Sequence, residues 1–141
     1  MAGHSFSWQD VEHVGDADQH RGGTPREDGI RVNKRMVGSV AVLTLTGELD
    51  AHSAPTTQLM LSRVMPGKAP VLLDLSEIRY ISSAGLRTLL LVYRRAQRIG
   101  IPIALVGLSE TLRGVLSATG FLRFFRVAEN ITDGVTVLDD G

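Results

Sequence analysis

The segment from Val71 to Ala96 constrains the fold more than any other part of the sequence, because it reads as a strand, a turn and a helix in succession. Its first five residues are apolar except for Asp74, which is typical of a strand buried on both faces in a parallel sheet. Its last part repeats apolar residues at helical spacing, as far as Tyr93 and Ala96. This unit predicts an α/β fold with a parallel sheet.

The turn inside this segment, Ser82 to Gly85, is the first candidate site. The start of a helix leaves backbone N–H groups unpaired and carries the positive end of the helix dipole. A negative group, such as a phosphate on serine, is therefore favoured there. Judged on composition alone, either Ser82 or Ser83 is more typical of a helix N-cap than of a phosphorylated residue.

Motifs in and around this segment resemble those of the STAS domain, the fold of the bacterial anti-sigma factor antagonists. The resemblance covers residues 29 to 140 and rests on three motifs in order. They are Leu45-Thr46-Gly47-Glu48-Leu49-Asp50, then Asp74-Leu75-Ser76 with Ser82-Ser83-Ala84-Gly85-Leu86, and finally Gly107-Leu108 with Thr119-Gly120-Phe121-Leu122. The resemblance implies a STAS-like mixed β-sheet with a mostly parallel core and about four helices.

The local patterns predict the same order of elements, ββαβαβαβα. We expect a hairpin of two strands, a loop at residues 47 to 52, a helix capped by Ser53, the central strand and helix, and then two further strand–helix pairs. The expected strands are Ile30–Arg35, Val40–Thr46, Val71–Leu75, Ile101–Val106 and Phe124–Val127, and the expected helices are Ser53–Met65, Ser82–Gly100, Ser109–Gly120 and one opening at Asn130.

The resemblance also implies a function. In the antagonists, the serine that follows an acidic residue at the helix start is phosphorylated by the anti-sigma factor, and this serine corresponds to Ser83. Ser82 stands where the family has the acidic residue. We therefore expect a non-enzymatic regulator without a cofactor or metal. Its unphosphorylated form would bind an anti-sigma factor serine kinase and release the sigma factor, and a PP2C-type phosphatase would reset it.

Two alternatives remain open at this point. The first is a STAS subunit of a lipid-transport ATPase or another complex, which would bind its partner without phosphorylation. The second is a small enzyme with an anion site at the Ser82 and Ser83 turn. A serine hydrolase does not fit, because its elbow needs glycine two residues before the nucleophile, where Ser83 has Ile81, and because all four histidines precede Ser83.

The expected partner surface has two parts. Glu48 and Asp50 lie on a loop that the resemblance places beside the phosphoacceptor, although the residues alone favour solvated loop charges. Arg87, Leu91, Arg94 and Arg98 follow helical spacing along one face, which we expect to be exposed. The full set of predicted partner-binding residues is Glu48, Asp50, Ser82, Ser83, Ala84, Gly85, Arg87, Leu91, Arg94 and Arg98.

Charge divides the chain into two parts. Residues 1 to 28 hold six acidic and two basic residues, whereas residues 29 to 141 hold nine acidic and thirteen basic residues. We expect the first part to be a mostly disordered acidic extension and the second to be the STAS domain. The bases are scattered and no nucleic-acid-binding motif occurs, so nucleic acid is not an expected partner. The absence of cysteine and of an apolar run near 20 residues favours a cytoplasmic protein without a membrane span.

Overall fold

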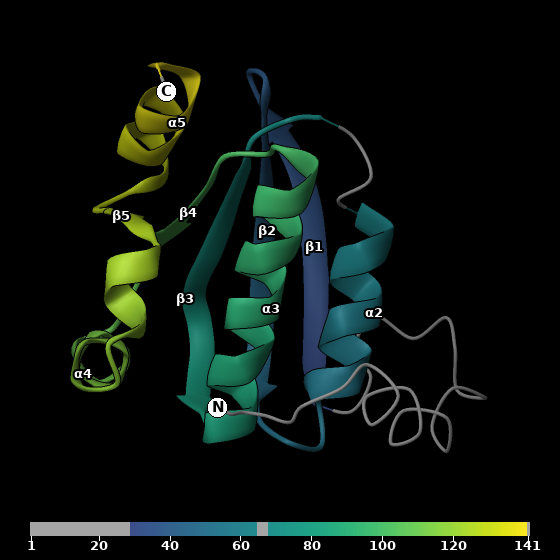
Figure 1. Cartoon of the computed structure of the whole chain (residues 1–141), viewed down its shortest axis with the longest axis vertical. Coiled ribbons are helices and arrows are strands. Elements are labelled where there is room, and N and C mark those ends of the chain that lie inside the picture. Colours follow the sequence, from purple (N-terminus) through teal and green to yellow (C-terminus); the bar gives the residue numbers. More distant parts are fainter. Residues whose placement is uncertain (1–28, 65–67, 141) are drawn as a thin grey trace.

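The computed structural model describes residues 29–64 and 68–140, and Figure 1 shows how their strands and helices are arranged. In chain order, the elements are β1 (Ile30–Val37), β2 (Val40–Leu49), α2 (Ala54–Val64), β3 (Val71–Ile81), α3 (Ser83–Ile99), β4 (Ile103–Val106), α4 (Glu110–Ala118), the 3-10 helix η3 (Phe121–Phe124), β5 (Arg126–Ala128) and α5 (Ile131–Asp140). The predicted order ββαβαβαβα is confirmed. The expected disorder of residues 1–28 and the expected helix end at Met65 concern residues outside the described ranges.

The five strands form one mixed sheet in the order β1-β2-β3-β4-β5. β1 and β2 pair as an antiparallel hairpin around Gly38, whose φ is +60°, and β2 through β5 are parallel. Because each parallel connection carries a helix, the carboxyl ends of β2, β3 and β4 lie at one edge of the sheet. The turn that contains Ser82 follows β3 at this edge.

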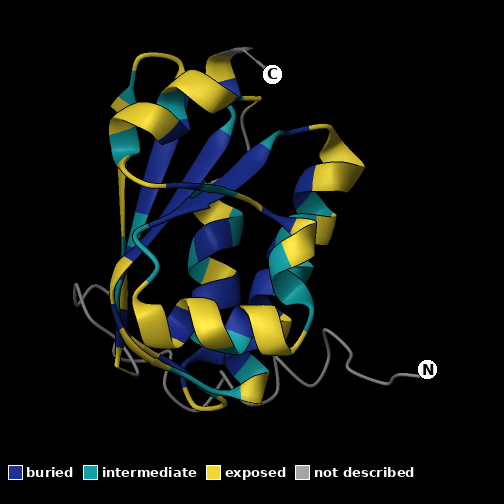
Figure 2. Ribbon diagram, turned by 90° about the vertical axis from the view of Figure 1, so that its left-hand side faces the viewer, coloured by how far each residue is buried: buried dark blue, intermediate teal, exposed yellow. Residues whose placement is uncertain are grey.

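Two apolar clusters hold the helices to the two faces of the sheet. On one face, Leu73 and Leu105 of the strands pack with residues of α2, α3 and α4, among them Leu89. On the other face, Leu72 of β3 packs with Leu138 of α5. The alternation of Leu72 and Leu73 between the clusters is what a strand buried on both faces requires. Figure 2 shows the strands mostly buried and the outer surfaces of the helices exposed.

Several predicted strand ends are wrong, because the sheet extends beyond its apolar runs. β2 continues through Gly47 to Leu49 where a loop was expected, and β3 continues to Ile81 instead of ending at Leu75. These extensions pair with each other, Leu49 opposite Ile81, across irregularities in the register. The added residues include exposed polar side chains, which carry no apolar strand signal.

The predicted last strand is also displaced. Phe124 belongs to the 3-10 helix, and β5 begins at Arg126. The rings of Phe124 and Phe125 lie 5.8 and 5.3 Å from the ring of Tyr93 on α3, distances typical of packed aromatic pairs. This contact between distant segments favours the 3-10 turn over a strand that would begin at Phe124.

The predicted ends of α3 and the start of α4 are confirmed. Gly100 ends α3 in the left-handed region, with φ of +76°, and the Ser109 Oγ accepts a hydrogen bond from the Leu112 amide at 3.0 Å. Among the helices of the described ranges, none combines the length and the apolar character needed to cross a membrane.

Candidate functional site

The two serines before α3 have different surroundings. Ser82 is the N-cap, with extended backbone angles, and its Oγ accepts a hydrogen bond from the Gly85 amide at 3.3 Å. The Ser82 carbonyl oxygen also accepts from the Leu86 amide at 2.9 Å. Ser83 is the first residue of the helix, it is exposed, and its hydroxyl has no hydrogen-bond partner among the described residues. Because Ser82 takes the structural role, Ser83 is left available for chemistry.

The start of α3 lies directly against the end of β2. The Ser82 amide donates a hydrogen bond to the Leu49 carbonyl oxygen at 2.9 Å. At Gly85, a Cβ atom would overlap this same oxygen and would lie 2.9 Å from the Leu49 carbonyl carbon. Only glycine, which has no Cβ, allows α3 to come this close to β2. Gly85 is buried, so it sets the position of the helix start and does not contact a partner.

The loop after β2 is tied by two reciprocal hydrogen bonds and a third that reaches back to β2. The Asp50 carboxylate accepts from the Ser53 amide at 3.0 Å, and the Ser53 Oγ accepts from the Asp50 amide at 3.1 Å. The Ser53 hydroxyl then donates to the Glu48 carbonyl oxygen at 2.6 Å. Ser53 directly precedes α2 as predicted, and its carbonyl oxygen accepts from the Thr57 amide at 2.9 Å, but its side chain binds back into the loop and does not cap the helix. Asp50 is half-buried with one oxygen already engaged, whereas Glu48 is exposed.

Asp74 has the structural role that its place in an apolar strand suggested. Its carboxylate accepts from the Ser76 amide at 3.0 Å and from the Thr44 hydroxyl at 3.3 Å. Gly107, with φ of +79°, packs its backbone so close that an added Cβ would lie 2.8 Å from the Asp74 oxygen. These contacts join the middle of β2 and β3 to the turn that follows β4.

The predicted face of α3 is only partly as expected. Arg87, Arg94 and Arg98 are exposed, but Leu91 is half-buried, so its predicted exposure is wrong. α3 packs against α2 as well as against the sheet. At about 1.5 Å rise per residue, Arg98 lies roughly 22 Å along the helix from Ser83. Arg87, one turn after Ser83, is therefore the basic residue of this face nearest the site.

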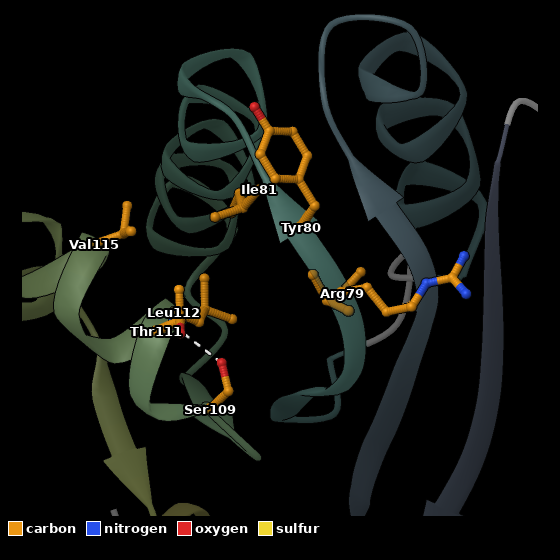
Figure 3. Close-up of a pocket in the computed structure, with 8 residues that line it drawn as sticks. Arg79, Tyr80, Ile81, Ser109, Thr111, Leu112 and Val115 are labelled. Carbon is orange, nitrogen blue, oxygen red and sulfur yellow. Dashed lines mark hydrogen bonds between the residues drawn. The ribbon is translucent and has the colours of Figure 1, made fainter.

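A pocket that the sequence did not reveal opens beside the Ser82 turn. It has a volume of about 140 Å³ and lies between the end of β3 and the start of α4, with Tyr80, Ile81, Leu112 and Val115 in its lining. Figure 3 shows the Tyr80 ring at its rim and the aliphatic side chains below. Tyr80 is 55% exposed, which is unusual for so large an apolar ring. In the sequence, the only indication of this pocket is Tyr80, an aromatic residue two positions before Ser82.

The structure thus brings Glu48, Asp50, Ser82, Ser83 and Ala84 to one edge of the sheet, over the buried Gly85. The arginines at 94 and 98 are not brought there and extend along α3. The edge presents a free hydroxyl on a helix N-terminus, and Leu49, which lies between Glu48 and Asp50, is bonded to the adjacent Ser82 amide.

Comparisons with known proteins agree on the family. The model of the STAS domain family matches residues 31–134. BtrV of Bordetella bronchiseptica, named for a proposed role as an anti-sigma factor antagonist, is 33% identical over 102 residues, which cover 72% of this chain and 88% of BtrV.

Solved structures show the same fold. An anti-sigma factor antagonist from Mycobacterium paratuberculosis superimposes with a TM-score of 0.71 at 22% identity, covering 83% of this chain and all (100%) of that one. The unphosphorylated form of the anti-sigma factor antagonist SpoIIAA gives a TM-score of 0.64 at 19% identity, over 78% and 97% of the two chains. The chain therefore belongs to the STAS domain family, alongside bacterial anti-sigma factor antagonists.

Proposed function

We propose that the protein is an anti-sigma factor antagonist that works by partner switching. In its unphosphorylated form it binds an anti-sigma factor that is also a serine kinase, and this binding releases the sigma factor. Phosphorylation of Ser83 switches the binding off, and a PP2C-type phosphatase restores it. The proposal places the protein in the cytoplasm, as a regulator that is not itself an enzyme and needs no cofactor.

The observation that carries this proposal is the division of roles between the two serines. A phosphoacceptor needs a hydroxyl that is exposed to a kinase and that makes no hydrogen bond required by the fold. Ser83 is exposed and unpaired among the described residues, while Ser82 caps the helix. Modification of Ser83 therefore leaves the cap of α3 intact.

The electrostatics of the site support a switch. A phosphate adds a charge of about −1.5 to −2 at neutral pH. The free N–H groups and dipole at the start of α3 accommodate this charge within the folded protein. A partner docked over the same edge would have to bury it beside Glu48, at a high cost in desolvation and like-charge repulsion. The same modification is thus tolerated by the fold and harmful to the complex.

The proposed contact surface extends from Ser83 in two directions. Along α3, Ala84 and Arg87 follow directly, and Arg94 and Arg98 extend the surface for a longer partner. Toward α4, Tyr80 and its pocket offer an apolar anchor, of the kind that dominates many interfaces.

Partner capture with charge variants tests the proposal. The wild type, Ser83→Glu and Thr132→Glu would be immobilised and exposed to lysate of the source cell, and captured proteins identified by mass spectrometry. The partner would then be purified and titrated calorimetrically. Thr132 is the matched control, because it is exposed in the first turn of α5, a helix on the opposite face of the sheet.

We expect Ser83→Glu to weaken binding at least tenfold, about 1.4 kcal/mol, and Thr132→Glu to leave it nearly unchanged. The captured partner should carry a kinase domain. A partner without one, bound equally well by all three proteins, would contradict the proposal and favour a STAS subunit of a transport or other complex.

A further inference from the structure

One part of the sheet is covered by no helix among the described residues. α5 packs on Val42, Leu72 and neighbouring apolar residues, and this face of the sheet continues beyond them. Arg35 lies opposite Val42 and Arg31 lies opposite Thr46 in the β1–β2 hairpin, so their side chains share the α5 face of the sheet. We call this uncovered part the basic sheet face and define it by Arg31, Asn33, Arg35, Thr44, Thr46, Glu77 and Arg79.

The third strand completes this face. The Thr46 hydroxyl donates a hydrogen bond to the Glu77 carboxylate at 2.9 Å, which places both side chains on the same side. Arg79 follows two residues later and therefore shares the face. Its guanidinium points away from the Tyr80 pocket, toward β2 and β1, in Figure 3.

The charge of this face is unbalanced. Arg31, Arg35 and Arg79 are all exposed, and none of their guanidinium groups makes a hydrogen bond or ion pair with another described residue. Two exposed acids share this face: Glu77, which is bound to Thr46, and Glu48, which follows Thr46 by two residues on β2 while Leu49 packs on the opposite face. Asp74 lies beneath the face, buried and already bonded to Thr44 and Ser76. Three unpaired guanidinium groups thus face solvent on a surface with two exposed carboxylates.

The chain itself carries a segment of matching charge. Residues 10–18 contain four acids, Asp10, Glu12, Asp16 and Asp18, and no lysine or arginine. We call these nine residues the acidic segment. Fully extended, they span about 30 Å. The basic residues extend from the row of Arg35 to Arg79, which is roughly 20 Å at about 3.4 Å per residue along the strands.

The place where the N-terminal residues join the domain also favours contact between the acidic segment and the basic sheet face. Gly29 precedes β1, whose first residue lies opposite Gly47 and hence in the row of Ile78 on β3. The chain therefore joins the domain at the edge strand, two residues from Arg31. The residues between Asp18 and Gly29 reach up to about 35 Å, enough for any point of this face. The arginines of α3 are less accessible from there, because α2 packs on both β1 and α3 and lies between them.

We propose that the basic sheet face is an intramolecular docking surface for the acidic segment, residues 10–18 of the same chain. Complementary charge drives this association, so it depends on the screening length, which falls from about 10 Å at 0.1 M salt to about 3 Å at 1 M. The proposal concerns a face other than the Ser83 edge and does not depend on the proposed function.

Paramagnetic relaxation in the full-length protein tests this proposal. The chain has no cysteine, so Ala17→Cys gives a single attachment point for a nitroxide in the middle of the acidic segment. Amide spectra of the isotopically labelled chain would be compared with the nitroxide oxidised and reduced. We expect selective intensity loss in β1, in the second half of β2 and around Glu77 to Arg79. This loss should disappear at 1 M salt.

Charge-reversal variants make the test specific. The triple variant Arg31→Glu, Arg35→Glu, Arg79→Glu should abolish the selective loss, whereas Arg94→Glu with Arg98→Glu should preserve it. Selective loss on α3 instead, or no selective loss at low salt, would overturn the proposal. So would a loss that persists when the nitroxide and the isotope label are on different molecules, because that result assigns the contact to a second copy. The salt comparison needs only Ala17→Cys and no charge reversal, so it remains decisive if the triple variant fails to fold.

Discussion

Replacing Gly85 by alanine tests the closest backbone contact at the candidate site. An added Cβ would overlap the Leu49 carbonyl oxygen and would lie 2.8 Å from the Ile81 side chain. The Leu49 oxygen cannot move aside by rotating a side chain, because it belongs to the backbone and accepts the Ser82 amide at 2.9 Å. The helix start must therefore shift away from β2.

Two opposing effects set the size of the change. Alanine in place of glycine inside a helix stabilises it by up to about 1 kcal/mol. An extra methyl group in a tightly packed site costs about 1–3 kcal/mol, and a backbone neighbour favours the upper part of that range. We therefore expect Gly85→Ala to lower the free energy of unfolding by about 2 kcal/mol, the difference between these terms.

Urea unfolding followed by far-ultraviolet circular dichroism measures this change. Dichroism is the appropriate signal, because the only tryptophan, Trp8, lies in residues 1–28. Gly114→Ala on α4 is the matched control, since a Cβ at Gly114 meets nothing within 4 Å, and it should stabilise the protein by up to about 1 kcal/mol. Equal stabilisation by both variants would refute the close approach of α3 to Leu49.

Three further predictions concern stability and are checked by the same unfolding measurement. Ser82→Ala should cost about 1 kcal/mol through the lost cap, whereas the exposed Ser83→Ala should stay within about 0.5 kcal/mol; the reverse order would mean that the two roles are exchanged. Asp50→Ala should cost about 1 kcal/mol, because the Ser53 amide loses its acceptor, and an unchanged midpoint would show that this bond does not form in solution. Leu138→Ala should cost about 2–5 kcal/mol, since this side chain of α5 is 2% exposed and packs against the sheet; a cost under about 1 kcal/mol would mean that α5 is not packed on the sheet.

Local signals in the sequence predicted the order of strands and helices and the position of the two serines at the start of α3. Ser82, Ser109 and Gly100 were placed correctly because a cap depends on a few neighbouring residues. The order of strands and helices followed from apolar periodicity, which each segment carries by itself. The position of Ser83 at the head of α3 followed from the same signals.

The remaining features depend on contacts between distant segments, which local patterns do not report. Leu91 was expected to be exposed, but it is half-buried on a helix that packs against α2. Ser53 is a residue type that commonly caps helices, yet its hydroxyl donates a hydrogen bond to the Glu48 carbonyl oxygen instead. The Tyr80 pocket exists only where β3 meets α4, and no single stretch of sequence encodes it.

The central claim, that Ser83 is the residue whose modification switches binding, is tested most directly by mapping the phosphate. The protein would be incubated with its purified anti-sigma factor and ATP, digested, and sequenced by mass spectrometry, with Ser83→Ala treated in parallel. We predict a single phosphate on Ser83, absent from Ser83→Ala. A phosphate on Ser82, or equal labelling of Ser83→Ala, would contradict the claim.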